Sequence, residues 1–137
     1  MEIRKVLLAE DEEDIRKVAQ ISLEFRGGWD VALAVDGEEC LAKAAAERPD
    51  LILLDAMMPK MDGYEACRRL KQDPALKDIP VIFLTAKSQE SEVRLGLSLG
   101  AIGYLIKPFN PMSLVAEIRE ILESDLAASS QEDNRKD

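Results

Sequence analysis

Five polar residues stand directly after short runs of Val, Ile and Leu, at the point where each run ends. Glu10 and Asp11 follow the first run, Asp55 follows a later one, and Thr85 and Lys107 follow two more. Apolar runs of this length are typical of strands in a parallel sheet. The C-terminal ends of such strands lie along one edge of the sheet, where ligands bind. We therefore expect these five side chains to converge.

The expected cluster carries a surplus of negative charge. Glu10, Asp11 and Asp55 bring three carboxylates, and Lys107 offsets one of them. Two carboxylates about 4 Å apart repel each other by about 4 kcal/mol at an effective dielectric constant of about 20. A divalent cation would remove this repulsion, and oxygen ligands favour a hard ion. A site with few protein oxygens favours Mg²⁺ over Ca²⁺, because Mg²⁺ keeps several of its waters.

An aspartate in such a site can act as a nucleophile toward phosphorus. Asp55 would then form an aspartyl phosphate, while Mg²⁺ and Lys107 stabilise the charge on the transferring phosphoryl group. The Thr85 hydroxyl and the backbone N–H of Ala86 could donate hydrogen bonds to phosphoryl oxygens. Taken singly, each residue has a structural explanation, such as a helix cap or a surface position. Their order along one expected edge is what favours phosphoryl transfer.

Five apolar runs alternate with segments of helical spacing, which predicts an α/β fold with a parallel sheet and right-handed crossovers. The runs cover residues 6–9, 31–35, 51–54, 81–84 and 101–106. Most are continuous rather than alternating, as in strands that are covered on both faces. Asp36 follows the second run, and an outer position of that strand would keep Asp36 away from the cluster.

The segments between the runs have apolar residues at helical spacing. In the first, Ile15, Val18, Ser22 and Phe25 fall on one face, and a Gly-Gly pair follows. Further helices are expected near residues 41–45, 64–70 and 90–99, and the last helix has an apolar stripe of Leu114, Val115, Ile118, Ile121 and Leu122. After residue 123 the sequence is polar and without periodicity. We expect a domain over residues 1–123 and a disordered tail or linker stub over residues 124–137.

The composition of the 137-residue chain excludes several functions and fits one domain. With 27 acidic and 18 basic residues, the net charge of −9 repels phosphates, so we expect no direct binding of nucleic acid. The absence of histidine excludes His-dependent catalysis and an internal phosphohistidine. Cys40 and Cys67 form no metal motif and suggest buried thiols in a reducing compartment. No apolar run approaches the roughly 18 residues of a membrane span, so we expect a cytoplasmic protein without membrane contact.

Several stretches carry a family resemblance: VLLAEDEEDIR, LILLDAMMPKMDGYEACRRL, IPVIFLTAK and GAIGYLIKPF. Together they resemble the receiver domain of bacterial two-component response regulators over residues 3–122. The resemblance implies a flavodoxin-like fold with a five-stranded parallel sheet in the order 2-1-3-4-5. It also implies a phosphorylation-dependent signalling switch, with no enzymatic activity beyond self-catalysed phosphotransfer and autodephosphorylation.

The resemblance further implies roles for the residues of the cluster. Asp55 would be the phosphoacceptor. Mg²⁺ would be bound by Asp11, Asp55 and the backbone carbonyl of Met57, with Glu10 acting directly or through water. The family usually has two aspartates where this chain has Glu10-Asp11, which leaves the metal role of Glu10 open. Met57 and Lys87 stand at positions that modulate dephosphorylation in the family, so the lifetime of the phosphoryl group is also open.

The resemblance implies a second group of residues that transmits the signal. Lys107 would contact the phosphoryl group, and the peptide bond to Pro108 is expected to be cis. Thr85 would move toward the phosphoryl group, and Tyr104 would turn into the space that Thr85 leaves. Tyr104 and Lys107 are three residues apart on one strand, so they point to opposite faces. The surface of the fourth helix, fifth strand and fifth helix would change and bias partner binding.

The expected partners are proteins. A histidine kinase or a phosphotransfer protein would donate the phosphoryl group, and a downstream effector protein or an output domain would receive the signal. Other functions remain open. One is a phosphatase of the haloacid dehalogenase type, although Asp55-Ala56-Met57 lacks that family's second aspartate. Another is a receiver that serves as a docking scaffold without phosphorylation. A flavodoxin-like cofactor protein has little support, because no glycine-rich nucleotide motif is present.

Overall fold

Strands and helices alternate in the computed structural model, which describes residues 2–86 and 90–135. The strands are β1 (Lys5–Ala9), β2 (Asp30–Ala34), β3 (Leu51–Asp55), β4 (Val81–Thr85) and β5 (Gly103–Ile106). The helices are α1 (Glu13–Phe25), α2 (Gly37–Glu47), α3 (Gly63–Gln72), α4 (Glu90–Ser98) and α5 (Leu114–Arg135). Each predicted strand and helix overlaps an observed one.

All neighbouring strands are parallel, and the sheet order is β2-β1-β3-β4-β5. The predicted flavodoxin-like fold is therefore confirmed. The register pairs Ala9 with Leu54, Asp55 with Leu84, and Thr85 with Ile106. These pairs lie at the ends of β1, β3, β4 and β5, so the residues that follow these strands are brought to one edge of the sheet.

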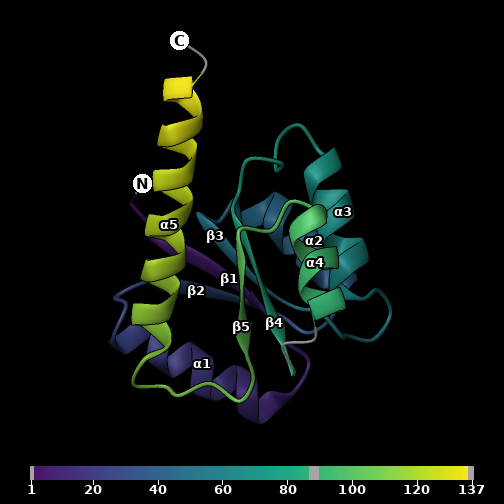
Figure 1. Cartoon of the computed structure of the whole chain (residues 1–137). Coiled ribbons are helices and arrows are strands. Elements are labelled where there is room, and N and C mark those ends of the chain that lie inside the picture. Colours follow the sequence, from purple (N-terminus) through teal and green to yellow (C-terminus); the bar gives the residue numbers. More distant parts are fainter. Residues whose placement is uncertain (1, 87–89, 136–137) are drawn as a thin grey trace.

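The sheet is the middle of three layers, with α2, α3 and α4 on one face and α1 and α5 on the other (Figure 1). Successive residues of a strand face opposite layers. Leu7 belongs to the apolar core beneath α2 and α3, and Leu8 belongs to the core beneath α1 and α5. Both side chains are fully buried. Cover on both faces explains why the strands are continuous apolar runs in the sequence.

Two aspartates cap helices near the edge that carries the polar residues. The Asp36 carboxylate accepts a hydrogen bond from the Glu39 N–H at 2.8 Å, and Asp62 accepts one from the Glu65 N–H at 2.9 Å. Each satisfies an N–H that the first turn of the helix leaves unpaired. Asp36 also lies 3.7 Å from the Lys60 ammonium nitrogen. Because β2 is an outer strand, Asp36 stays out of the carboxylate cluster, as expected.

The apolar face predicted for α1 is only partly the buried face. Ser22 is buried, but Val18 is 43% exposed and Phe25 is 85% exposed. The core contains Ala19 and Leu23 instead. Helical spacing shows which residues share a face of the helix, but it does not show whether the sheet covers that face.

The last helix extends into the segment that we expected to be a disordered tail or linker stub. α5 continues to Arg135, and its last turns project beyond the sheet (Figure 1). The extension contains no proline or glycine, so no strong helix breaker interrupts it although the apolar stripe has ended. The domain boundary at residue 123 stays a prediction, and residues 136–137 lie outside the described residues. None of the helices in the described ranges has both the length and the apolar character of a membrane span.

Candidate functional site

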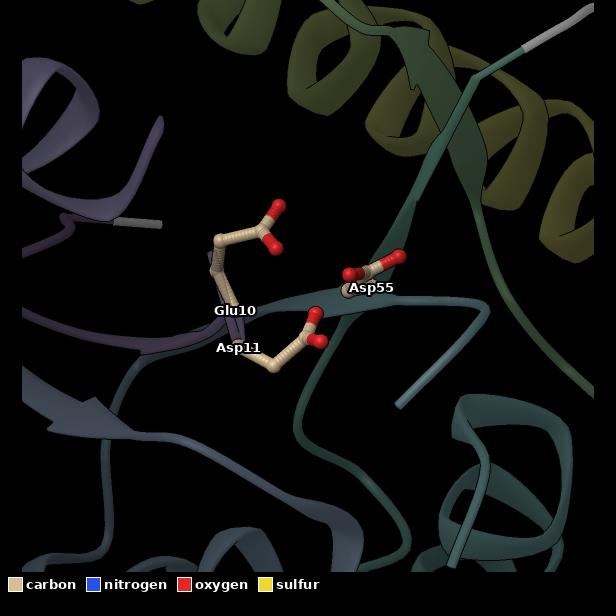
Figure 2. A group of neighbouring side chains, drawn as sticks. All are labelled: Glu10, Asp11 and Asp55. Atoms are coloured by element: carbon tan, nitrogen blue, oxygen red, sulfur yellow. The ribbon is translucent and has the colours of Figure 1, made fainter. Parts of the chain in front are cut away.

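Three carboxylates meet where β1 and β3 end (Figure 2). Glu10 and Asp11 follow β1 directly, and Asp55 is the last residue of β3. One oxygen of each residue lies within 4.8 Å of those of the other two. Glu10 and Asp55 are buried, whereas Asp11 is exposed. The sheet thus brings together the three carboxylates that the sequence placed at one edge.

The two carboxylate oxygens of Asp55 have different surroundings. Oδ1 accepts a hydrogen bond from the Met57 N–H at 3.1 Å. Oδ2 lies 3.1 Å from the Lys107 ammonium nitrogen, but no donor among the described residues gives it a hydrogen bond. A buried oxygen in this condition is unfavourable unless another group satisfies it. Oδ2 is therefore the oxygen that a cation or an electrophile would stabilise.

Lys107 reaches the cluster from the loop that follows β5. Its backbone N–H donates to the Thr85 carbonyl at 2.7 Å, which fixes it beside the end of β4. Its ammonium group donates a hydrogen bond to Glu10 Oε1 at 3.0 Å and forms an ion pair with Asp55 Oδ2 at 3.1 Å. The Lys107 side chain is only 9% exposed. When all three carboxylates are ionised, Lys107 offsets one of their negative charges.

Burial and neighbouring charges together shift the pKa values of Asp55 and Lys107. Burial, reinforced by the neighbouring Glu10 carboxylate, raises the pKa of Asp55 to about 8. The Met57 N–H and the Lys107 ammonium oppose this rise only in part. Burial disfavours the charged form of Lys107, but Glu10 and Asp55 outweigh it, so the pKa of Lys107 is raised. Lys107 therefore stays charged, while a further cation beside Asp55 would favour the ionised form of its carboxyl.

A cavity of about 250 Å³ opens beside Asp55. Its lining contains the expected residues Asp11, Asp55, Met57, Thr85, Ala86 and Lys107, together with Glu12, Ala56, Tyr64 and Glu92. Sequence reasoning missed Tyr64 and Glu92. Both come from helices, α3 and α4, whose packing at the sheet edge is not contained in a pattern of strand ends.

Thr85 and Tyr104 lie on neighbouring strands and differ in exposure. Thr85 is buried at the end of β4, whereas Tyr104 on β5 is 38% exposed and pairs in register with Phe83. Tyr104 lines a separate groove of about 460 Å³ along β5 and α5. The Lys107 side chain, in the loop after β5, is only 9% exposed, and its predicted orientation opposite to Tyr104 stays a prediction. Lys87 lies outside the described residues.

Two loop anchors near the site were missed by sequence reasoning. The Gly63 N–H donates to the Ala56 carbonyl at 2.9 Å, which closes the loop after β3. The Ser22 hydroxyl of α1 donates to the Pro111 carbonyl at 2.7 Å and tethers the loop after β5. In that loop the Lys107–Pro108 peptide bond is cis. Both anchors end on backbone carbonyls of loops, for which residue type alone carries no signal.

The donor atoms of the cavity fit a hard divalent cation. Asp11 and Asp55 offer carboxylate oxygens, and Met57 lines the same cavity. Oxygen donors with no nitrogen or sulfur ligand favour ions such as Mg²⁺. The buried Oδ2 of Asp55, which lacks a hydrogen bond, would gain a partner from such an ion. The residues present are thus chemically suited to a metal ion.

Comparison with known proteins decides the family. The family profile described as "Response regulator receiver domain" matches residues 6–119. The chain belongs to this family. Receiver domains are phosphoacceptors of two-component signalling rather than classical enzymes, and this receiver domain is a phosphorylation-dependent signalling switch of that kind.

Relatives and solved structures agree with this assignment. The transcriptional regulatory protein PhoP of Bacillus subtilis is 48% identical over 130 residues, which cover 94% of this chain and 53% of PhoP. RpaA of Synechocystis is 42% identical over 118 residues, which cover 86% of this chain and 48% of RpaA. The structure of chemotaxis regulator CheY4 of Vibrio cholerae superimposes with a TM-score of 0.81 at 34% identity, covering 88% of this chain and 99% of CheY4. The BeF3-activated receiver domain of DrrB gives a TM-score of 0.75 at 32% identity, covering 89% of this chain and 99% of that domain.

The receiver domain spans about half the length of the curated relatives it matches. PhoP is named as a transcriptional regulatory protein and RpaA as a DNA-binding transcriptional regulator. The expectation that this chain makes no direct contact with nucleic acid therefore gains no support from them. It stays a prediction, based on the net charge of −9, for the residues of this chain.

Proposed function

We propose that Asp55 of this receiver domain is the phosphoacceptor and that a phosphohistidine of a kinase or phosphotransfer protein is the donor. Asp55 Oδ2 forms a bond to phosphorus while the donor's phosphorus–nitrogen bond breaks. The electron pair of that bond leaves with the imidazole, which takes up a proton from water. The observation that carries this proposal is the buried Oδ2 without a hydrogen bond, on a residue that lines a cavity and faces an ammonium group.

The proposed cofactor is Mg²⁺, held by Asp11, Asp55 and the backbone carbonyl of Met57. When bound, the ion supplies positive charge to the transferring phosphoryl group. Lys107, which is paired with Glu10 and Asp55, supplies a second positive charge. Its low exposure strengthens its interaction with the phosphoryl oxygens. The Thr85 hydroxyl and the Ala86 N–H are the proposed hydrogen-bond donors to the remaining oxygens.

The proposed switch couples this site to the surface of α4, β5 and α5. Thr85 moves toward the phosphoryl group, and Tyr104, half-exposed on the neighbouring strand, turns inward. Because Tyr104 lines the groove along β5 and α5, its rotation changes the surface offered to a partner. Phosphorylation then acts by shifting the population between two surface states.

The chain acts stoichiometrically in this proposal, with autodephosphorylation as its only turnover. Its partners are the phosphodonor protein and either a downstream effector protein or an output domain, and its compartment is the cytoplasm.

Incubation with acetyl phosphate and Mg²⁺ tests the phosphoacceptor. One acid-labile phosphoryl group should be added per chain, and acetate should leave as the phosphorus–oxygen bond of the donor breaks. Asp55→Asn should abolish labelling, because the amide is not a nucleophile toward phosphorus. Asp78→Asn, at an exposed aspartate, is the matched control and should label normally. Intact-protein mass spectrometry measures the product, and equal labelling of Asp55→Asn would overturn the assignment.

Thermal melting with and without Mg²⁺ tests the metal ligands. An ion that binds only the folded chain stabilises it, by about 2.7 kcal/mol at a concentration 100 times the dissociation constant. Asp11→Ala should lose most of this stabilisation, because it removes a carboxylate that lines the cavity. Asp14→Ala, at an exposed acidic residue of α1, should keep it. Equal Mg²⁺-dependent shifts in the two variants would exclude Asp11 as a ligand.

A further inference from the structure

The cavity beside Asp55 has two carboxylates that the proposed metal site does not use. Glu12 and Glu92 both line it, and both residues are exposed, so they lie where the cavity opens to solvent. Glu12 directly precedes α1, whereas Glu92 belongs to α4, and these helices cover opposite faces of the sheet (Figure 1). We call Glu12 and Glu92 the acidic rim, because they flank the opening from two different layers.

The charge of the acidic rim is not compensated within the described part of the chain. None of the ion pairs found there includes Glu12 or Glu92. Glu12 is the N-cap of α1, but its carboxylate makes no capping hydrogen bond. Its backbone N–H donates to Glu10 Oε2 at 3.1 Å, which holds residue 12 beside the site. Burial raises the pKa of the Tyr64 hydroxyl, and the Glu92 carboxylate adds to this rise, so the Glu92 charge acts on the cavity wall.

The charges around the cavity are unevenly placed. Its lining contains four acids and one base, namely Asp11, Glu12, Asp55, Glu92 and Lys107. The positive charge of Lys107 lies deep in the site, beside the buried Oδ2 of Asp55 that lacks a hydrogen bond. The acidic rim lies nearer to solvent, where a donor enters and its leaving group departs. Because a cleft focuses the field of the charges that line it, the rim repels anions and attracts cations at the opening.

We propose that the acidic rim selects phosphodonors that release a nitrogen base over acyl phosphates, an inference that rests on the phosphoacceptor role of Asp55. The leaving group of an acyl phosphate is a carboxylate, which Glu12 and Glu92 repel. The leaving nitrogen of a phosphoramidate carries positive charge or N–H groups, which form charge-assisted hydrogen bonds to carboxylates. A phosphohistidine belongs to this favoured class. Selectivity comes from repulsion of one class of donor as well as from attraction of the other.

The reactions with the two classes of donor differ in the bond that breaks. With either donor, Asp55 Oδ2 forms a bond to phosphorus. With acetyl phosphate, the phosphorus–oxygen bond breaks and its electron pair leaves with acetate. With phosphoramidate, the phosphorus–nitrogen bond breaks and its electron pair leaves with the nitrogen, which already carries its protons and departs as ammonia. The nucleophile and Lys107 are the same in both reactions, so a comparison of the two donors reports on the leaving group.

Labelling rates of the full chain with these two donors at saturating Mg²⁺ test the proposal. In the double variant with Glu12→Gln and Glu92→Gln, the ratio of the acetyl phosphate rate to the phosphoramidate rate should rise about fivefold at low ionic strength. The matched control, with Glu13→Gln and Glu90→Gln, removes the same charge from α1 and α4 at residues that do not line the cavity. Intact-protein mass spectrometry measures both rates. A ratio that changes no more in the rim variant than in the control would refute the proposal.

Ionic strength separates an effect of charge from a change in structure. Salt at about 1 M shortens the Debye length to about 3 Å, so it should remove most of the difference between the rim variant and the parent. A difference in donor ratio that salt does not reduce would count against the acidic rim as its cause.

A single variant covers the case in which the double variant does not fold. Glu92→Lys reverses one charge, which alters the rim as much as neutralising two, so it should raise the donor ratio by a similar factor. A folded Glu92→Lys chain with the donor ratio of the parent would refute the proposal. Failure of the phosphoacceptor assignment would appear separately, as labelling of Asp55→Asn by either donor. An unchanged donor ratio in a chain that still requires Asp55 would remove only the role of the acidic rim.

Discussion

Replacing Gly63 with alanine is expected to lower the free energy of unfolding by about 3 kcal/mol and to reduce phosphorylation of Asp55. An added Cβ at Gly63 would lie 2.1 Å from the Asp55 carbonyl oxygen and 2.9 Å from its carbonyl carbon. Neither atom can rotate away, because both belong to the backbone at the end of β3. The clash must therefore move α3 or the residue that carries the proposed nucleophile.

The matched control for this substitution is Gly28→Ala. Gly28 has a φ of +69°, and nothing lies within 4 Å of an added Cβ. Alanine there meets only the strain of the left-handed region, about 1–2 kcal/mol. Urea unfolding measures both free energies, and labelling by acetyl phosphate at a temperature where both variants are folded measures the site. Equal destabilisation of the two variants, or normal labelling of Gly63→Ala, would show that the contact between position 63 and the Asp55 backbone is not the cause of the effect.

The strands and their parallel arrangement were predictable because the chain encodes them with redundancy, whereas the strand order followed from the family resemblance. Runs such as Leu51–Asp55 are apolar at nearly every position, since both faces of the strand are buried. Their spacing allows only helical crossovers between parallel neighbours. The residues at the strand ends follow from the same pattern. Asp55 and Thr85 therefore reached the correct edge without any knowledge of side-chain contacts.

The features that the sequence did not predict depend on tertiary contacts. Val18 and Phe25 share a helical face with buried Ser22, yet the sheet does not cover them. The hydrogen-bond partners of Glu10 could not be read from its residue type, because a glutamate beside an aspartate gives the same sequence signal wherever its oxygens point. Only the contacts with Lys107 and Glu12 separate the two acids. Sequence patterns locate a site well, but they do not show which partner each of two adjacent carboxylates contacts.

The second large effect concerns pH in the absence of metal. Asp55→Asn should stabilise the metal-free protein by about 2 kcal/mol at pH 8, and this gain should disappear toward pH 4. Burial raises the pKa of Asp55 to about 8, from an ordinary value of 3.8. Between these values the folded chain holds a proton that the unfolded chain has released. The free energy of unfolding of the parent therefore falls as pH rises through this window.

The size of this stability difference follows from the shift in the pKa of Asp55. Each unit of pKa difference corresponds to about 1.4 kcal/mol, so the full shift sets an upper bound of about 6 kcal/mol, which relaxation and water entry reduce. Urea unfolding with a chelator at several pH values measures the difference, with Asp78→Asn as the exposed-aspartate control. A parent and an Asp55→Asn variant with parallel pH profiles would show that Asp55 is ionised without metal.

Magnesium should reverse the sign of this dependence. An ion beside Asp55 favours the ionised carboxylate, so protons and Mg²⁺ compete for the same oxygen, and stabilisation by Mg²⁺ should grow as pH rises from 5 toward 8. The parent should show this growth, while Asp55→Asn should respond to Mg²⁺ weakly and equally at all pH values. The strained, partly protonated carboxylate of the metal-free state and the reactive nucleophile of the metal-bound state are then two ionisation states of one residue. The metal, rather than the fold alone, would set when Asp55 can accept a phosphoryl group.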